Sequence, residues 1–190
     1  SGSGSSALIV TVTAGTTGTA ATAAFNAALA KLSYTANGTA ATSDTLTIKT
    51  TDARNTSDTD TVALTVNAAP IAPVNTVPTT LTGVLTGQAK AISGITVSDA
   101  DNNLASVTLS VGHGTLGVTS SAGVTVENNN SATVTLKGAN ATQLNAVLAT
   151  LSYTATSSYT GTDSLTVVTA DSTAANLGGP KTTTNTLADF

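Results

Sequence analysis

The stretch SDADNN at residues 98–103 concentrates side chains that can bind a hard cation. Two aspartates alternate along it, and two asparagine amides follow directly. Calcium takes about six to eight oxygen ligands, so carboxylate and amide oxygens on one tight turn suit it. A later carboxylate, Asp163 or Asp171, could add to the set if the fold brings it close. The predicted calcium ligands are Asp99, Asp101, Asn102 and Asp171, and the alternative is an ordinary polar turn.

His113 and Glu127 are the only residues of their types in the chain. A catalytic histidine needs converging partners, and no Ser-His-Asp order or cysteine accompanies this one. A glycosidase needs two carboxylates at a defined separation, and the sequence does not show such a distance between Glu127 and Asp163. We therefore place His113 in a turn or at a sheet edge, and we predict that the protein is not an enzyme.

Four asparagines stand in the Asn-x-Ser/Thr pattern of glycosylation acceptors. Sugars would hydrate a surface that has few charges, although the pattern also arises by chance in a chain rich in Asn and Thr. The candidate acceptors are Asn37, Asn55, Asn129 and Asn140.

The composition limits both the core and the partners of the protein. Only 8% of the 190 residues are charged, against roughly 25% in ordinary soluble domains, and Cys, Met and Trp are absent. The core must be built from Val, Leu, Ile and Ala. The lack of cysteine excludes a disulfide framework and a zinc–thiolate site. A net charge of −4 gives no basic surface for nucleic acid, and no apolar run approaches the ~20 residues that span a bilayer.

Two parts of the chain repeat each other at an offset of 119 residues, which aligns Leu32 with Leu151. FNAALAKLSYTA lies over LNAVLATLSYTA, and SDTLTIKTTDA lies over TDSLTVVTADS. TDTVA matches TNTLA after six extra residues in the second copy, and upstream VTV matches VTL. Similarity of this extent indicates duplicated modules.

One full period runs from about Ala69 to Phe190, and residues 1–68 match only its C-terminal half. The joining segment VNAAPIAPVNTVP contains three prolines, which restrict the backbone and favour an extended, stiff connection. The predicted organisation is a partial repeat over 1–68, a linker over 69–78 and a complete repeat over 79–190.

Most segments alternate apolar with small polar residues, which is the period of a half-buried strand. Clusters of Gly and Asn separate them, as turns require. The clearest predicted strands are 60–66, 91–99, 104–111, 132–138 and 163–170. Many short strands in a module of this length favour a two-sheet sandwich.

One segment in each copy has the spacing of a short helix instead. The apolar positions are Phe25, Ala28, Leu29 and Leu32 in the first copy and Leu144, Val147, Leu148 and Leu151 in the second. Asn140 and Gln143 form a weak capping box before the second helix. Each helix is predicted to lead into a strand that carries Tyr34 or Tyr153. The predicted fold is all-β: tandem immunoglobulin-like or cadherin-like β-sandwich repeats with one short helix per repeat.

Several phrases resemble one family of repeats, and they are PVNTVP, ISGITVSDAD, VTLSVGHGTL, LNAVLATLSYTA and YTGTDSLTVVTAD. They are similar to the tandem cadherin-like or immunoglobulin-like repeats of large bacterial surface adhesins, often exported by type I secretion in Gram-negative bacteria. The resemblance covers 69–172 and, as a half repeat, 7–68. It implies a spacer, fibre or adhesion scaffold outside the cell, and it names no ligand.

The chain departs from that family in its linker. The family linker often reads VNDAP, with an aspartate that helps to bind calcium between domains, whereas this chain reads VNAAPIAP. The departure weakens the resemblance as support for an interdomain calcium ion.

The half module raises the question of what completes it. Three explanations stay open: the chain is a piece of a longer repeat protein, the half module is a degenerate cap, or a neighbouring chain completes it by strand addition. We expect an extracellular or cell-surface structural module of an adhesin, fibre or surface layer, which self-associates or adjoins neighbouring repeats. The alternative is a module that binds carbohydrates or surfaces through the loops at one end of the sandwich.

Overall fold

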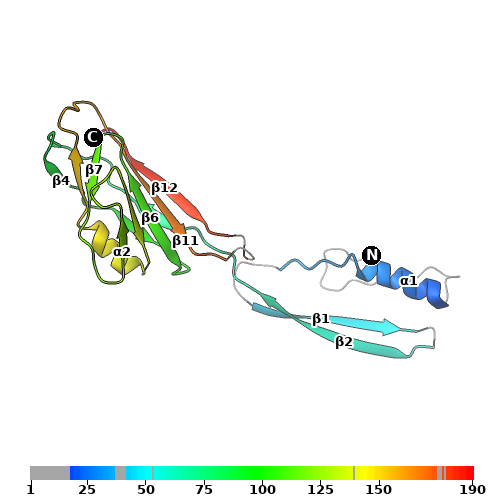
Figure 1. Ribbon diagram of the computed structural model, residues 1–190. Helices are drawn as coiled ribbons and strands as arrows, with labels where there is room; N and C mark the ends of the chain where they lie inside the picture. Colours follow the sequence, from blue (N-terminus) through cyan, green and yellow to red (C-terminus); the bar gives the residue numbers. More distant parts are fainter. Residues whose placement is uncertain (1–17, 37–41, 53, 139, 175–176, 178) are drawn as a thin grey trace. The chain divides into compact units, whose positions relative to one another are not determined.

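The chain divides into two units, one within residues 1–66 and the other built on Asn67–Phe190 (Figure 1). Strands in antiparallel sheets form most of the regular structure, with two short helices among the described residues, which confirms the all-β prediction. Neither of these helices is long and apolar enough to span a membrane. The computed structural model describes residues 18–36, 42–52, 54–138, 140–174, 177 and 179–190.

The described residues of the first unit form a helix and a hairpin. Helix α1 spans Gly18–Leu29, and strands β1 (Thr42–Thr51) and β2 (Ser57–Val66) pair in a two-stranded sheet. Asn55 turns the chain between the strands with a φ of 64°, a left-handed conformation that asparagine tolerates better than most residues. No residue of α1 is buried. The described part of this unit therefore has regular structure but no buried residue.

The second unit holds ten strands and one helix among its described residues. Its elements are β3 (Val74–Thr76), β4 (Ala89–Ala91), β5 (Thr96–Ser98), β6 (Leu104–Ser110), β7 (Gly114–Gly117), β8 (Thr125–Glu127), β9 (Thr133–Lys137), α2 (Ala141–Leu148), β10 (Ser152–Ala155), β11 (Leu165–Asp171) and β12 (Thr182–Leu187).

The strands of the second unit form one large sheet and two small ones. The five-stranded sheet has the order β12-β11-β6-β9-β8, so β6 lies between two strands that come much later in the chain. A three-stranded sheet has the order β4-β10-β7, and β3 pairs with β5. In the centre of the large sheet Val107 faces both Leu136 and Thr169. The two halves of the module are therefore interleaved within the same sheets.

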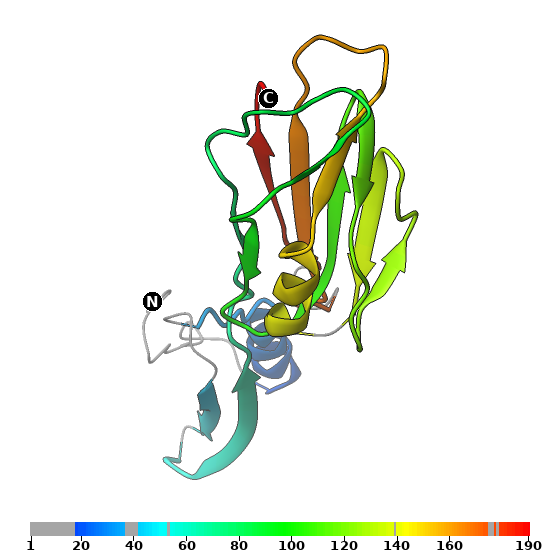
Figure 2. The ribbon, with the colours of Figure 1, turned by 90° about the vertical axis from the view of Figure 1, so that its left-hand side faces the viewer.

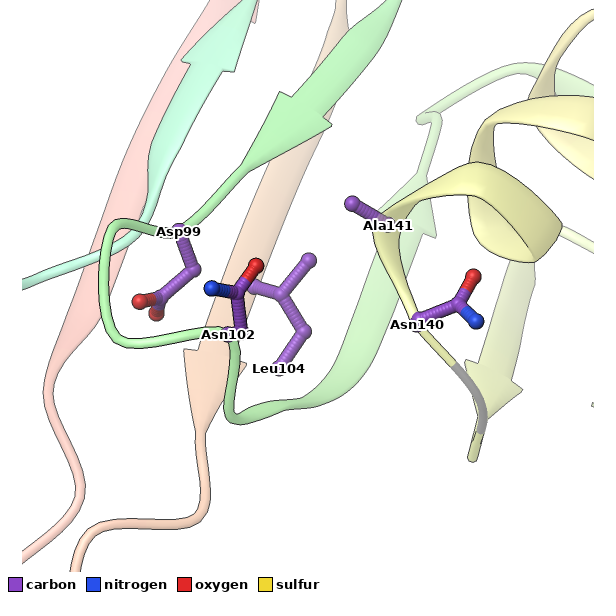
Figure 3. A pocket seen from close by; sticks show the side chains of 5 residues that line it. All are labelled: Asp99, Asn102, Leu104, Asn140 and Ala141. Carbon is purple, nitrogen blue, oxygen red and sulfur yellow. The ribbon is translucent and has the colours of Figure 1, made fainter.

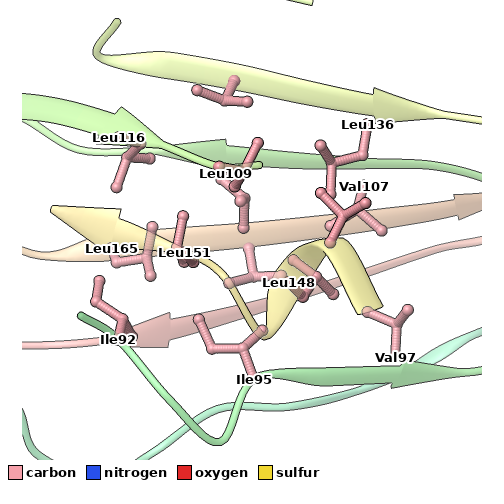
Figure 4. Packing of buried hydrophobic residues seen from close by; sticks show 14 of the residues in the cluster. Ile92, Ile95, Val97, Val107, Leu109, Leu116, Leu136, Leu148, Leu151 and Leu165 are labelled. Atoms are coloured by element: carbon pink, nitrogen blue, oxygen red, sulfur yellow. The ribbon is translucent and has the colours of Figure 1, made fainter. Parts of the chain in front are cut away.

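The large sheet and the three-stranded sheet share one hydrophobic core. Alternate side chains of β11 are buried, and apolar residues of β6 and β9 lie beside them, as the period of two predicts. Tyr153 of β10 and Leu116 of β7 close the core from the other sheet, and α2 adds three buried residues. Figure 4 shows Leu116, Leu148 and core residues of the large sheet gathered between the ribbons, and α2 lies beside one end of the strands (Figure 2).

Helix α2 is fixed at its start and along its length by asparagines. Asn140 forms the predicted capping box with Gln143, in which each side chain accepts a bond from the other's backbone N–H. Further along, Asn145 Oδ1 accepts the N–H of Val97 at 2.8 Å, and its Nδ2 donates to the Val97 carbonyl at 3.0 Å. Asn145 therefore connects the helix to β5 as a neighbouring strand would.

The structure differs from the sequence prediction at three places. Residues 91–99 do not form one strand, because Gly94 takes a φ of 85° and separates β4 from β5. Strand β3 lies inside the predicted 69–78 linker, so the compact unit begins before residue 79. Tyr34 lies in a segment without strand structure, and α1 begins earlier than the predicted helical face and ends before Leu32.

Candidate functional site

Asp163 joins the two halves of the second unit. Its Oδ1 accepts the N–H groups of Gly112 at 2.9 Å and Ser164 at 2.8 Å. Its Oδ2 accepts the N–H of His113 and the hydroxyl of Tyr153, both at 2.8 Å. Four donors from three places in the chain thus converge on one carboxylate that is only 7% exposed. We call these five residues the Asp163 cluster.

Burial and hydrogen bonding act in opposite directions on the Asp163 carboxyl. Burial raises its pKa, but the bonds from His113, Tyr153, Gly112 and Ser164 outweigh that effect, so the pKa lies below its usual range. The pKa of Tyr153 is raised, first because the phenol is desolvated and second because it donates to Asp163. At neutral pH the cluster therefore holds an ionised carboxylate and a neutral phenol.

Two motifs within the adhesin-like phrases, GHGTL (112–116) and YTGTDSL (159–165), contain glycines that make room for aromatic rings. A Cβ on Gly114 would lie 2.4 Å from the ring of Tyr153, and one on Gly161 would lie 2.5 Å from the hydroxyl of Tyr159. His113 stacks on Tyr159, with ring centroids 3.9 Å apart. GHGTL and YTGTDSL therefore meet in space, because His113 stacks on Tyr159 and the N–H groups of Gly112 and His113 donate to Asp163. His113 lies in the predicted turn, and its ring contacts Tyr159.

The first unit contains the same arrangement without its partners. Tyr34, which aligns with Tyr153, donates its hydroxyl to Asp44 Oδ2 at 2.9 Å, and the N–H of Thr45 donates to Asp44 Oδ1 at 2.8 Å. These bonds match those that Tyr153 and Ser164 make in the Asp163 cluster. The hydrogen bond to Asp44 is the main cause that raises the pKa of Tyr34. Among the described residues, nothing supplies Asp44 with counterparts of the N–H groups of Gly112 and His113.

A second aspartate also repeats its bonds in both units. Asp52 Oδ1 accepts the N–H groups of Arg54 at 2.8 Å and Thr56 at 2.9 Å. Asp171 Oδ1 likewise accepts the N–H groups of Thr173 at 3.0 Å and Lys181 at 2.8 Å.

The surroundings of Asp171 lower its pKa. Burial raises that pKa, but the hydrogen bonds from Thr173 and Lys181 and the positive charge of Lys181 lower it more. Asp171, predicted as a calcium ligand, thus closes the turn that leads into β12.

The other predicted calcium ligands lie on the turn between β5 and β6. Asp99 Oδ1 accepts the N–H of Asp101 at 2.7 Å, and Asp101 Oδ2 accepts the N–H of Ile71 at 2.7 Å. Asn102 has a φ of 56°, so it serves the bend of the turn. Figure 3 shows the Asp99 carboxylate within this bend, beside a small pocket that Asn102, Leu104 and Asn140 also line.

Asn103 connects this turn to that of Asp171. Its Nδ2 donates to Thr173 Oγ1 at 3.4 Å, and its carbonyl accepts the N–H and the hydroxyl of Ser172, both at 2.9 Å. Three buried acceptors of the two turns have no hydrogen-bond partner among the described residues, and they are Asp99 Oδ2, Asp171 Oδ2 and Asn103 Oδ1. No group of three or more His, Cys, Asp or Glu side chains gathers in the described part of the chain, so a cation here would also need amide and backbone oxygens.

The remaining candidates are held by local contacts. Glu127 forms an ion pair with Lys137 at 2.8 Å on the surface of the large sheet, whereas Asp163 is bonded to Gly112, His113, Tyr153 and Ser164. Asn129 uses its side chain twice on Val118, accepting its N–H at 3.0 Å and donating to its carbonyl at 2.9 Å. A sugar on that amide nitrogen would cost the second of these bonds.

The other three glycosylation candidates differ in how their side chains are used. Asn140 caps α2, Asn55 is exposed in the hairpin turn, and Asn37 lies outside the described residues.

Comparisons with family models, curated proteins and solved structures give no match to this chain. Its function must therefore be argued from the motifs and from the contacts they make.

Sequence reasoning missed Asn145 and considered Asp163 only as a spare calcium ligand or as the second carboxylate of a glycosidase. Both had a signal in the repeat, because Asn145 aligns with Asn26 and Asp163 aligns with Asp44. A polar residue that is kept at one position of two otherwise apolar helices indicates a specific hydrogen bond.

Proposed function

We propose that the chain is an extracellular structural module of a bacterial surface adhesin, fibre or surface layer, built from immunoglobulin-like or cadherin-like repeats. The observation that carries the proposal is the meeting of GHGTL and YTGTDSL at the Asp163 cluster. These motifs carry the resemblance to adhesin repeats, and their residues hold one half of a module to the other. Their role is to hold shape, which is what a spacer in an array requires.

The recurrence of the same polar contacts in both units supports an array of repeats. The bonds of Tyr153, Asp163 and Asp171 have counterparts at Tyr34, Asp44 and Asp52. The low content of charged residues fits a surface hydrated by hydroxyl and amide groups.

Immunogold labelling of intact cells that produce the protein tests this proposal. An antibody against residues 67–190 should label the outer surface, in fibres or in a continuous layer. Label that appears only after the cells are lysed would contradict an extracellular role. A glycan array tests the alternative that the chain is a carbohydrate-binding module. That alternative predicts saturable binding of the purified chain, and substitutions in the sandwich-end loops should abolish it.

We also propose that the turns at Asp99 and Asp171 bind calcium. The unpartnered oxygens of Asp99, Asn103 and Asp171 favour this, since buried acceptors without donors are costly unless a cation satisfies them. Calorimetry should show a higher melting temperature in calcium than in chelator, because an ion that binds only the folded state stabilises it. Asp99→Asn should abolish the difference, whereas Asp60→Asn, at an exposed position of β2, should leave it unchanged. Equal melting temperatures in both conditions for the unmodified chain would contradict the site.

A further inference from the structure

Among the described residues, the first unit exposes apolar side chains whose counterparts are buried in the second unit. The second unit therefore shows which strands would cover them. Tyr34 is 50% exposed and Leu32 41% exposed, whereas their counterparts Tyr153 and Leu151 are each 1% exposed. Val62, which aligns with Leu187, is 46% exposed against 1%. Residues that form core in the complete module thus face solvent in the incomplete one.

In the second unit, a single stretch of chain supplies most of that covering. Strand β6 pairs with the edge of β11, and β4 and β7 flank β10 on both sides. All three come from residues 74–127, which we call the β3–β8 segment. In the first unit, β1 pairs only with β2 among the described residues, and the stretch with Tyr34 forms no strand. The strand neighbours that the first unit lacks are therefore those of the β3–β8 segment.

The β3–β8 segment also supplies hydrogen-bond partners to two polar side chains of the second unit. The counterparts of these side chains in the first unit have no such partners among the described residues. Asn145 bonds to the backbone of Val97 in β5, but its counterpart Asn26 is exposed and makes no side-chain hydrogen bond among the described residues. Asp163 accepts two N–H groups from the loop between β6 and β7, and no described residue donates such groups to Asp44. A general apolar partner would not satisfy these positions, because each needs backbone groups at a fixed place.

We propose that the first unit is a docking site for a β3–β8 segment of a neighbouring repeat of the same type, outside residues 1–190. The docked segment adds a strand to β1, places strands on both sides of Tyr34, donates two loop N–H groups to Asp44 and offers a strand backbone to Asn26. This is strand addition with polar specificity. The inference adds a partner to the proposed array function, and it rests on that function only in requiring that repeats adjoin one another.

A second copy of the same chain does not meet this need. Residues 1–190 contain one β3–β8 segment but two copies of the elements that it completes. If two chains exchanged segments, each would still contain one complete module and one incomplete one. Association would then cost translational and rotational entropy without any gain in burial. The occupant that raises the number of complete modules must bring its own β3–β8 segment.

The test extends the full chain at its N-terminus by a second copy of residues 69–130. Amide exchange over 44–66 should slow by about a hundredfold or more, since the hairpin would then open only with a cooperative module. A matched extension that carries Val107→Asp in the added copy should give no slowing, because that side chain is fully buried in β6. Within the working extension, Asp44→Asn should remove much of the slowing and Asp60→Asn should not.

Two results would overturn the inference. One is unchanged exchange over 44–66 in the extended chain. The other is a parent chain that already exchanges slowly there and sediments as a dimer, which would make a second copy the occupant. Neither readout depends on where the protein lies in the cell. Failure of the surface-labelling experiment and failure of this one can therefore be told apart.

Discussion

The two units of this protein carry the same local bonds and differ in what is buried. Tyr34 and Tyr153 both donate to an aspartate ten residues further on, yet one ring is half exposed and the other is enclosed. The bond therefore forms from local sequence alone, because its partners are close along the chain. Burial is different, since it needs strands from a distant part of a module. The comparison separates contacts that shape a hairpin from contacts that make a core.

The largest expected difference between the units is in core packing. Leu151→Ala should destabilise the second unit by about 2–5 kcal/mol, because it removes a fully buried side chain and leaves a cavity. The matched Leu32→Ala should change the free energy of unfolding by less than about 0.5 kcal/mol, as exposed positions do. Urea unfolding of both variants measures this. Equal effects would mean that the first unit is already covered in solution.

Removing the charge of Asp163 should cause the next largest loss of stability. Asp163→Asn should cost about 1–3 kcal/mol, because the amide group cannot accept from all four donors. The matched Asp44→Asn should cost less, since Asp44 is exposed and accepts from two. The same unfolding experiment compares them, and a larger loss at Asp44 would contradict the proposed roles.

Acid should destabilise the second unit by protonating the carboxylates of Asp163 and Asp171. Asp163 and Asp171 have lowered pKa values, so the stability they contribute is present above the unfolded value of about 3.9 and is lost as the pH falls through the lowered folded values. Melting temperatures measured from neutral pH down to about pH 2 should fall over this window. Asp163→Asn should flatten the decline, and an unchanged profile would count against the cluster.

The smallest expected change in stability concerns α2 of the second unit, which packs buried residues into the core, whereas α1 has none. Asn140→Ala should destabilise that unit by about 0.5–2 kcal/mol, because it removes the capping box of α2. Asn140→Ser should restore much of the loss, since serine also caps helices well. Thermal unfolding followed by circular dichroism compares the two. If both variants lose the same stability, the asparagine has another role than capping.

Sequence alone predicted the class of fold and much of its internal order. The period of two located β6, β9 and β11 to within about two residues, and the capping box placed the start of α2. These features are local, so a single stretch of chain contains their signal. The break at Gly94 was missed because a glycine inside an alternating run can take either an extended or a left-handed conformation, and the sequence does not show which.

The sites were harder to predict because their partners are distant in sequence. The aspartates were recognised as oxygen-bearing turn residues, but nothing in SDADNN shows that Asp101 receives the N–H of Ile71. Asp163 receives donors from about fifty residues away, across a sheet whose strand order is not the chain order. Only the repeat indicated such contacts, since it keeps Asn26 and Asp44 in a unit whose described residues give them no long-range partner.

The paired turns at Asp52 and Asp171 have a practical consequence for engineering. The same aspartate oxygen closes the first hairpin on Thr56 and the second on Lys181, although six more residues intervene in the second. Register at the hairpin base is thus independent of tip length, and lengthening a loop adds little closure entropy. Peptide tags or epitopes inserted between Thr173 and Lys181 should be displayed without disturbing the strands beneath them.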